Sequence, residues 1–378
     1  MSNKIPIPPV FTHFSCSDSL DFTDEVTAAI LSRQIVQHQH GGQLLAASQK
    51  YRIPEEDWID LSTGISPRCY PLPQMPTRCW QRLPEINDGL EIAASAYYES
   101  ASLLAVSGSQ EAIQRLPLVL NRDTKKLRAG IVSAAYHSHQ QAWEKAGHEV
   151  VVLDSSDVND TIAALDVLIV VNPSNPGAEQ FATQTLLDWH QQLSAKNGTL
   201  IVDEAFIDST PEQSLITQKP KTGLIVLRSI GKFFGLAGVR LGFVWATPDL
   251  LKKIADKQDD WSVSHPARWA GKQALKDRHW QQQQREFLKH QSQRLKSILE
   301  KNIVHKWQKN KHEVTLKSTN LFVYMQTSSA EKLHTLLARR GILTRYFDNP
   351  HALRFGLPAN EAQWQRLEQE LLKIDSRF

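Results

Sequence analysis

Short, fully apolar segments alternate with helical patterns through the middle of the chain, and this alternation constrains the fold more than any other feature. The apolar segments are residues 103–106, 129–133, 149–153, 167–171, 200–202, 223–227 and 241–246. The segments with helical spacing are residues 89–98, 110–120, 140–146, 183–195 and 212–217. Strands that are apolar on both faces and connected by helices are typical of a mostly parallel sheet covered on both sides. The sequence therefore predicts an α/β fold.

The composition of the chain changes after His265-Pro266. Residues 267–301 are rich in Gln, Lys and Arg, with leucines and tryptophans at helical spacing, which predicts one long helix or a broken pair. We interpret the run Gln281–Gln284 as a solvated helix face. The remaining elements predict a smaller α+β domain; they are strands at 314–316, 321–325 and 353–356, a helix at 330–340 and a final helix. The expected domains are an N-terminal arm with part of the small domain (1–76), a large domain (77–265) and a C-terminal small domain (266–378).

The charge and cysteine content exclude several classes of protein. The 378 residues include 43 basic and 40 acidic side chains, and a net charge of +3 is too balanced to indicate a nucleic-acid or anionic-membrane partner. No apolar run approaches the roughly 20 residues of a membrane helix, and the first residues lack the apolar core of a signal peptide. The three cysteines lack metal-ligand spacing, so we expect reduced thiols, no metal site and a cytoplasmic location.

The segment from Leu227 to Phe243 carries the most reactive candidate residue. It places Lys232 among small and apolar residues in a glycine-rich turn, where poor hydration lowers the pKa of the amine. Neutral lysines of this kind form Schiff bases with aldehydes, including pyridoxal phosphate. Ser229 and Arg240 flank the lysine with a hydroxyl and a guanidinium that suit a phosphate. A buried loop whose lysine reaches solvent and whose arginine makes a structural ion pair is the alternative.

Four further strand ends carry residues that could bind a ligand, because ligands of parallel sheets bind beyond the carboxyl ends of the strands. Residues 107–110 open a helix, where free N–H groups bind phosphate, although a serine cap needs no ligand. Tyr136 could stack on a flat ring or pack in the core. Asn175 lies in a rigid Asn-Pro turn and could donate to a ligand oxygen, or simply belong to the turn. Asp203 could pair with a protonated ring nitrogen or with a structural cation.

Taken in order along the chain, these residues resemble the fold-type I, aspartate-aminotransferase-like enzymes that use pyridoxal 5'-phosphate. The chain is most similar to the branch that contains histidinol-phosphate aminotransferase and threonine-phosphate decarboxylase. Its motifs at 40–42, 60–67, 82–84 and 203–208 are most similar to the decarboxylase side. The resemblance covers roughly residues 38–375. It implies a large cofactor-binding domain with a mostly parallel seven-stranded sheet between helices, a smaller α+β domain, and a homodimer with the active site near the interface.

The resemblance also implies roles for individual residues. Lys232 would form the Schiff base and Asp203 would pair with the ring nitrogen; with Tyr136, which would stack on the ring, they would form the catalytic group. The residues implied to bind the cofactor are Gly108, Ser109, Gln110, Tyr136, Asn175, Asp203, Ser229, Lys232 and Arg240. The residues implied to bind the substrate are His40, Thr63, Gly64, Asn175, Arg345 and Arg354.

The chain departs from the usual pattern of this branch at a few positions. Phe206 stands where many relatives have a tyrosine that bonds the 3-oxygen of the cofactor, so one hydrogen bond is missing. Leu83 stands where relatives often place a tyrosine that reaches the cofactor phosphate of the partner subunit. Gly231 replaces a common serine, and the turn Asn175-Pro176-Gly177 is one residue shorter than usual.

The activity implied is decarboxylation of a small phosphorylated amino acid. O-phospho-L-threonine would lose CO₂ to give (R)-1-aminopropan-2-ol O-2-phosphate, the linker of the adenosylcobalamin nucleotide loop. An aminotransferase acting on a phosphorylated substrate such as histidinol phosphate is the alternative, because the outcome depends on which Cα bond stands perpendicular to the ring. A non-catalytic relative that serves as a partner in corrinoid biosynthesis is a third hypothesis, and the intact Lys232 and Asp203 argue against it.

Overall fold

The structure is a computed structural model that describes residues 41–121, 125–132, 137–309 and 313–374. Two of the candidate site residues, His40 and Tyr136, lie outside the described residues. By internal contacts the chain divides into residues 1–41 and residues 42–378, and the elements described below belong to the second group. Within the described ranges, the structure has no helix whose length and apolar character would let it cross a lipid bilayer.

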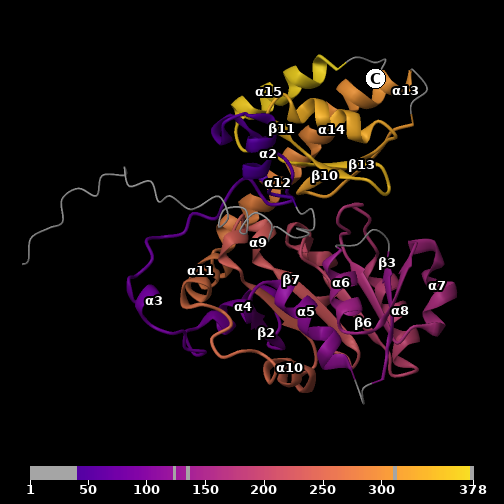
Figure 1. The fold of residues 1–378 in the computed structure, drawn as a ribbon. Helices are drawn as coiled ribbons and strands as arrows, with labels where there is room; N and C mark the ends of the chain where they lie inside the picture. Colours follow the sequence, from indigo (N-terminus) through magenta and orange to yellow (C-terminus); the bar gives the residue numbers. More distant parts are fainter. Residues whose placement is uncertain (1–40, 122–124, 133–136, 310–312, 375–378) are drawn as a thin grey trace, which may run out of the picture. The chain divides into compact units, whose positions relative to one another are not determined.

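A seven-stranded sheet forms the centre of the larger set of elements (Figure 1). Its strand order is β2-β8-β7-β6-β5-β3-β4, and β8 alone runs antiparallel to its neighbours. The strands are β2 (Leu103–Val106), β3 (Arg128–Val132), β4 (Glu149–Leu153), β5 (Val167–Val171), β6 (Thr199–Asp203), β7 (Leu224–Ser229) and β8 (Gly242–Trp245). The predicted α/β fold with a mostly parallel, seven-stranded sheet is confirmed.

Helices cover both faces of this sheet, because successive strand residues enter two different apolar clusters. Leu168 and Val170 of β5 pack on one face, whereas Val167 and Ile169 pack on the other. The helices of the first face are α4 (Leu90–Tyr98), α7 (Val158–Thr161), α8 (Thr183–Ser194) and α11 (His265–Lys276). Those of the second face are α5 (Ser109–Leu120), α6 (Ser138–Lys145) and α10 (Pro248–Ala255). Helices α5 and α6 begin shortly after β2 and β3 end, so their first turns lie at the carboxyl ends of these strands.

A four-stranded antiparallel sheet, in the order β12-β13-β10-β9, forms the second set of elements. Its strands are β9 (Thr315–Ser318), β10 (Phe322–Gln326), β12 (Arg345–Phe347) and β13 (Ala352–Gly356). Beside it β1 (Ile59–Asp60) pairs in parallel with β11 (Ile342–Leu343), so an N-terminal segment contributes here. The helices of this part are α2 (Leu44–Tyr51), α12 (Arg278–Leu299), α13 (His305–Gln308), α14 (Ala330–Ala338) and α15 (Glu361–Leu372). The domain boundaries expected at residues 76 and 265 stay a prediction.

Two expectations about helices are wrong, and one alternative is decided. Residues 212–217 form two 3-10 turns rather than a helix, because the carboxylate of Glu204 binds the N–H of Leu215 at 2.8 Å. The long C-terminal helix is a broken pair, since the Asp277 side chain caps α12 by accepting the N–H of Trp280 at 2.9 Å. Within the run predicted to be solvated, Gln281 and Gln284 are 3% and 0% exposed. Their spacing of three places both on the inner face of α12.

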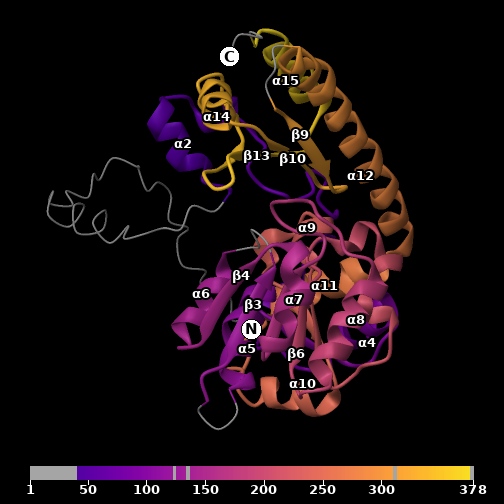
Figure 2. The ribbon, with the colours of Figure 1, turned by 90° about the vertical axis from the view of Figure 1, so that its right-hand side faces the viewer.

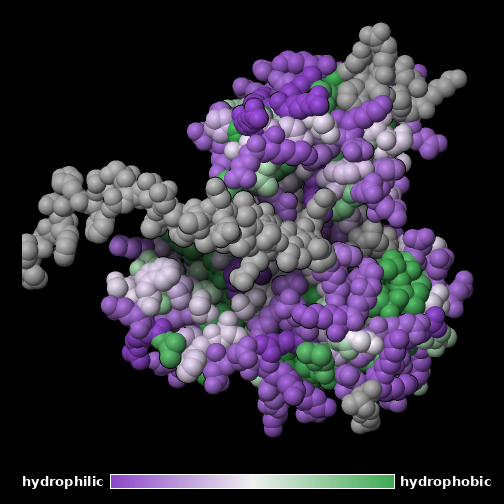
Figure 3. Space-filling model, viewed as in Figure 1, coloured by the Kyte–Doolittle hydropathy of each residue, from purple (hydrophilic) through white to green (hydrophobic). Residues whose placement is uncertain are grey.

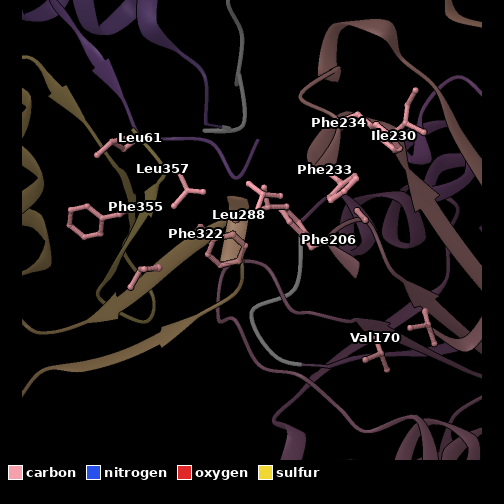
Figure 4. Close-up of a cluster of buried hydrophobic side chains, with 14 of the residues drawn as sticks. Leu61, Val170, Phe206, Ile230, Phe233, Phe234, Leu288, Phe322, Phe355 and Leu357 are labelled. Atoms are coloured by element: carbon pink, nitrogen blue, oxygen red, sulfur yellow. The ribbon is translucent and has the colours of Figure 1, made fainter. Parts of the chain in front are cut away.

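An apolar cluster fills the space between the two sheets (Figure 4). Phe206 follows β6, Phe322 begins β10, and Leu288 comes from α12. The rings of Phe206 and Phe322 meet edge to face, with their centroids 5.4 Å apart. A Cβ added to Gly64 would lie 2.9 Å from Phe206, so the loop after β1 approaches this cluster closely only because it carries glycine there.

Strand β7 carries a buried arginine just before the turn that holds Lys232. Arg228 is 2% exposed, and it forms ion pairs with the buried carboxylates of Glu204 and Asp208. It also donates to Ser214 Oγ at 2.8 Å, and its guanidinium lies 4.7 Å from the ring centroid of Tyr98. Two buried carboxylates therefore depend on one buried cation for compensation.

Replacing Arg228 with methionine should lower the free energy of unfolding by about 3–5 kcal/mol, because two buried carboxylates lose their cation. The matched control is Arg294→Met, which breaks the half-exposed pair with Glu361 and should have a much smaller effect. Urea unfolding of both variants at neutral pH measures the difference. Equal decreases in the free energy of unfolding of the two variants would show that Arg228 does not stabilise the fold through its ion pairs with the buried carboxylates.

Candidate active site

Lys232 lies in α9 (Ile230–Phe233), a four-residue helix that follows β7 directly. Ser229 caps this helix, since its Oγ accepts the N–H of Gly231 at 3.3 Å. The turn after the helix bends at Gly235, whose φ is +66° and whose added Cβ would lie 2.8 Å from Cys69 Cα. Only glycine fits there, so the lysine turn and the loop of residues 62–70 are packed backbone against backbone.

The surroundings of Lys232 favour its neutral form. Burial, together with the nearby guanidinium groups of Arg354 and Arg240, lowers the pKa of the lysine to about 8, while Asp203 opposes them. The Nζ atom lies 5.7 Å from the ring centroid of Phe206. At neutral pH about a tenth of the amine is therefore unprotonated and nucleophilic.

Asp203 ends β6 and is buried beside a histidine. Its Oδ2 lies 3.0 Å from Nε2 of His139, and its Oδ1 accepts the N–H of Ala205 at 3.1 Å. His139 belongs to α6, which follows β3, and both side chains are almost fully buried. His139 was not among the residues predicted from the sequence. Its place in the helix that starts at the ligand-binding edge of the sheet was the available signal.

A cradle of donors lies where α5 begins. Gly108 precedes the helix with a φ of +72°, and a Cβ added to it would lie 3.0 Å from the guanidinium of Arg240. A Cβ added to Gly242 would lie 2.7 Å from the backbone nitrogen of Ser109, and Gly242 pairs with Ser229 across β7 and β8. Gln110 lies in the same first turn of α5. These groups suit a phosphate at the helix N-terminus.

Arg354 stands on β13 and connects the two sheets through polar contacts. It donates from Nη1 to Asn175 Oδ1 and from Nη2 to the backbone oxygen of Ser62 at 2.6 Å. Burial and the guanidinium of Arg345 together lower its pKa to about 10, while Asp60 opposes them. Arg345 lies opposite Arg354 in the register of β12 and β13. Two desolvated cations side by side create a field that favours a substrate with acidic groups.

The loop after β1 approaches the same place. Ser62 Oγ donates to Asp60 Oδ1 at 2.6 Å and accepts the N–H of Gly42 at 2.7 Å. A Cβ added to Gly356 of β13 would lie 2.3 Å from the backbone oxygen of Thr63. The structure thus brings together the lysine, the carboxylate, the cradle, the two arginines and this loop. The individual binding roles stay predictions.

Comparison with known proteins places this geometry in a family. Residues 85–368 match the profile of the aminotransferase class I and II family. The chain belongs to this family. A threonine-phosphate decarboxylase from Pseudomonas aeruginosa is 46% identical over 88% of this chain and 97% of that protein. Another, from Sinorhizobium sp., is 36% identical over 89% of this chain and 98% of that protein.

The fold of this family member agrees with solved structures. A histidinol-phosphate aminotransferase from Sinorhizobium meliloti, in complex with pyridoxal-5'-phosphate, superposes with a TM-score of 0.74 over 95% of this chain and 98% of that chain. The two sequences are 17% identical, so this likeness shows the fold alone. The resemblance inferred from the sequence is confirmed.

Enzymes of this family depend on pyridoxal 5'-phosphate, and the prediction of that cofactor is confirmed. The residues present fit it. The glycine-lined cradle at Gly108, with the guanidinium of Arg240 beside it, offers a place for the phosphate. Asp203 offers a buried carboxylate for a protonated ring nitrogen, and Lys232 offers an amine of lowered pKa for the aldehyde.

The pKa of Lys232 makes a testable contribution to stability in the cofactor-free protein. It falls from 10.5 to about 8 on folding, so below pH 8 the folded state carries a buried charge that costs about 3 kcal/mol. The cost disappears as the pH rises from 8 to 10.5, because the folded state releases its proton first. Lys232→Met should therefore be stabilised relative to the wild type, and this advantage should shrink by about 2–3 kcal/mol between about pH 7 and about pH 10.

Denaturant unfolding at the two pH values measures this difference. The matched control is Lys289→Met, which replaces an exposed lysine of α12 and should show no such dependence. A stability difference for Lys232→Met that does not change with pH would contradict the assignment of a lowered pKa.

Proposed function

We propose that this protein decarboxylates O-phospho-L-threonine with pyridoxal 5'-phosphate, giving (R)-1-aminopropan-2-ol O-2-phosphate and CO₂. The observation that carries this proposal is the 46% identity with a threonine-phosphate decarboxylase along 97% of that protein's length. The pair Arg345 and Arg354 supports it, because two neighbouring cations suit a substrate that has both a carboxylate and a phosphate.

Different residues around Lys232 would bind different parts of the cofactor. The chemistry that the cofactor supplies when bound is withdrawal of electrons from the substrate Cα. Asp203, fixed by His139 and by the N–H of Ala205, presents a carboxylate that would keep a ring nitrogen protonated. The residues of the cradle, which would hold the phosphate of the cofactor, are Gly108, Ser109, Gln110, Ser229 and Arg240. Phe206, which is 3% exposed, contributes apolar surface beside the lysine.

The reaction breaks one bond and forms one. The bond from Cα to the carboxylate breaks, CO₂ leaves, and a proton is added at Cα. Lys232 is placed to give that proton from Nζ, because a pKa of about 8 lets it both accept and release protons near neutral pH. Arg354, which Asn175 and Ser62 hold in place, orients the acidic groups so that the carboxylate rather than the hydrogen departs.

We also propose a homodimer in the cytoplasm. Exposed, large apolar side chains gather in one short stretch, and they are Trp80, Leu83, Ile86 and Ile92. Arg268 holds this stretch rigid through Asp88 and Glu91 at 2.9 and 2.7 Å. The face in Figure 3 is mostly hydrophilic, with apolar residues in separate patches, so such a concentration favours a covered surface. The free thiols of Cys69 and Cys79 support a reducing compartment.

The substrate assay tests the proposed activity. With pyridoxal phosphate bound, the protein should release one CO₂ for each amine formed from O-phospho-L-threonine, and Lys232→Ala should abolish the release. Amino-group exchange is measured in parallel with histidinol phosphate and 2-oxoglutarate. Rapid exchange without CO₂ release would replace the decarboxylase with the aminotransferase.

A single charged substitution tests the proposed dimer interface. Ile86→Glu places a carboxylate on the most exposed apolar residue of the stretch and should convert the dimer to a monomer, because an unpaired charge would be desolvated at the interface. Leu372→Glu changes an exposed leucine of α15 in the same way and should leave the dimer intact. Light scattering after size exclusion measures both. A wild-type monomer, or a dimeric Ile86→Glu variant, would refute the proposal.

A further inference from the structure

A buried glutamine of α12 binds the turn that carries the lysine. Gln284 is 0% exposed, and its Nε2 donates to the backbone oxygen of Phe233 at 2.9 Å and to Ser66 Oγ at 2.7 Å. The backbone oxygen of Arg68 lies 3.4 Å from the same nitrogen. One amide therefore connects three segments: α12, the lysine turn and the loop after β1. This amide has no role in the chemistry proposed above.

The lysine turn needs such support because α9 is too short to hold itself. A four-residue helix leaves its last carbonyl groups without partners inside the helix. The backbone oxygen of Lys232 accepts the N–H of Ser66 at 2.9 Å, and the backbone oxygen of Phe233 accepts the amide of Gln284. Without Gln284, a buried carbonyl next to the lysine would have to find water.

The same helix also supports the strand that carries Arg354. Figure 2 shows α12 running past β9 and β10, which it contacts. Leu288 packs with Phe322 in the cluster of Figure 4, and Ser292 Oγ donates to the backbone oxygen of Thr319 at 2.5 Å. Arg354 lies opposite Tyr324 in the pairing of β13 with β10. Gln284 and Ser292 are two turns of one rigid helix apart, which is about 12 Å.

We propose that Gln284 is a positioning residue, which fixes the Lys232 turn relative to Arg354 through α12. The proposal rests on the proposed function, because it concerns the geometry between the amine that moves the proton and the cation that orients the substrate. A misplacement of about 1 Å between such groups can slow a reaction by about 100-fold. Gln284 thereby also keeps water away from the lysine.

The chain offers a matched control on the same helix. Gln281 lies one turn earlier and is 3% exposed. Its Nε2 donates to the backbone oxygens of Ala274 and Leu275, at 2.9 and 3.1 Å, which end α11. Gln281→Met and Gln284→Met each remove one buried amide and keep its approximate volume. Both should lower the melting temperature to a similar extent, but only Gln284→Met touches the lysine turn.

The first experiment measures the pKa of Lys232 in the protein without substrate or cofactor. Lysines of the cofactor-free protein are methylated reductively with ¹³C-formaldehyde, and the signal that is missing in Lys232→Met identifies Lys232. The pKa of Lys232 from the NMR titration should be the same in the wild type and in Gln281→Met. In Gln284→Met this pKa should rise toward that of an exposed lysine, because the loosened turn admits water.

The second experiment measures kcat and KM of the enzyme with pyridoxal phosphate bound and O-phospho-L-threonine as substrate. Gln284→Met should lower kcat by about 10- to 100-fold with KM within about twofold, since positioning rather than binding is lost. Gln281→Met should keep kcat within about twofold. Ser66→Ala removes only one acceptor of the amide and should shift kcat and the titration in the same direction, by less. If Gln284→Met does not fold, the proposal is tested with Ser66→Ala instead.

Two results would overturn the proposal. One is an unchanged Lys232 titration together with an unchanged kcat in Gln284→Met, or in Ser66→Ala if only that variant folds. The other is an equal change in Gln281→Met, which would mark a general loss of packing. A wild-type protein that releases no CO₂ would refute the decarboxylase, while the lysine titration would still decide the role of Gln284.

Discussion

The burial of one amine is the constraint on which the rest of the site depends. Lys232 is useful only if it is poorly hydrated and close to other cations, and both conditions disfavour its protonated form. A four-residue helix cannot hold such a group by itself. Ser229 therefore caps one end of the helix, while Ser66 and Gln284 satisfy carbonyl groups near the other.

The polar groups behind the site obey the same physics. A buried charge is tolerated where a partner meets it, and three charged groups around the site have such partners. Asp203 contacts His139, Arg228 contacts two carboxylates, and Arg354 binds two oxygens from other segments. Because these partners come from different elements, the buried polar contacts also fix how the elements meet. The rigidity that positions the reacting groups follows from the need to compensate their charges.

Most of the fold could be predicted from the sequence, and the errors have a common cause. The buried strands were located within two residues, because a strand covered on both faces must be apolar throughout. The expected helix at 212–217 was wrong, because a carboxylate from another segment takes the N–H of Leu215. The solvated reading of Gln281 and Gln284 was wrong, because composition does not reveal which face of a helix is covered.

The sequence by itself determined the sheet and the order of the polar residues at its strand ends, since both depend on local patterns of apolar and turn-forming residues. Tertiary structure alone decided which of those residues meet. His139 contacts Asp203 across 64 positions, Arg354 contacts Asn175 across 179, and Gln284 contacts Ser66 across 218. Such contacts leave no periodic signal in the chain, because they exist only after separate elements have packed together.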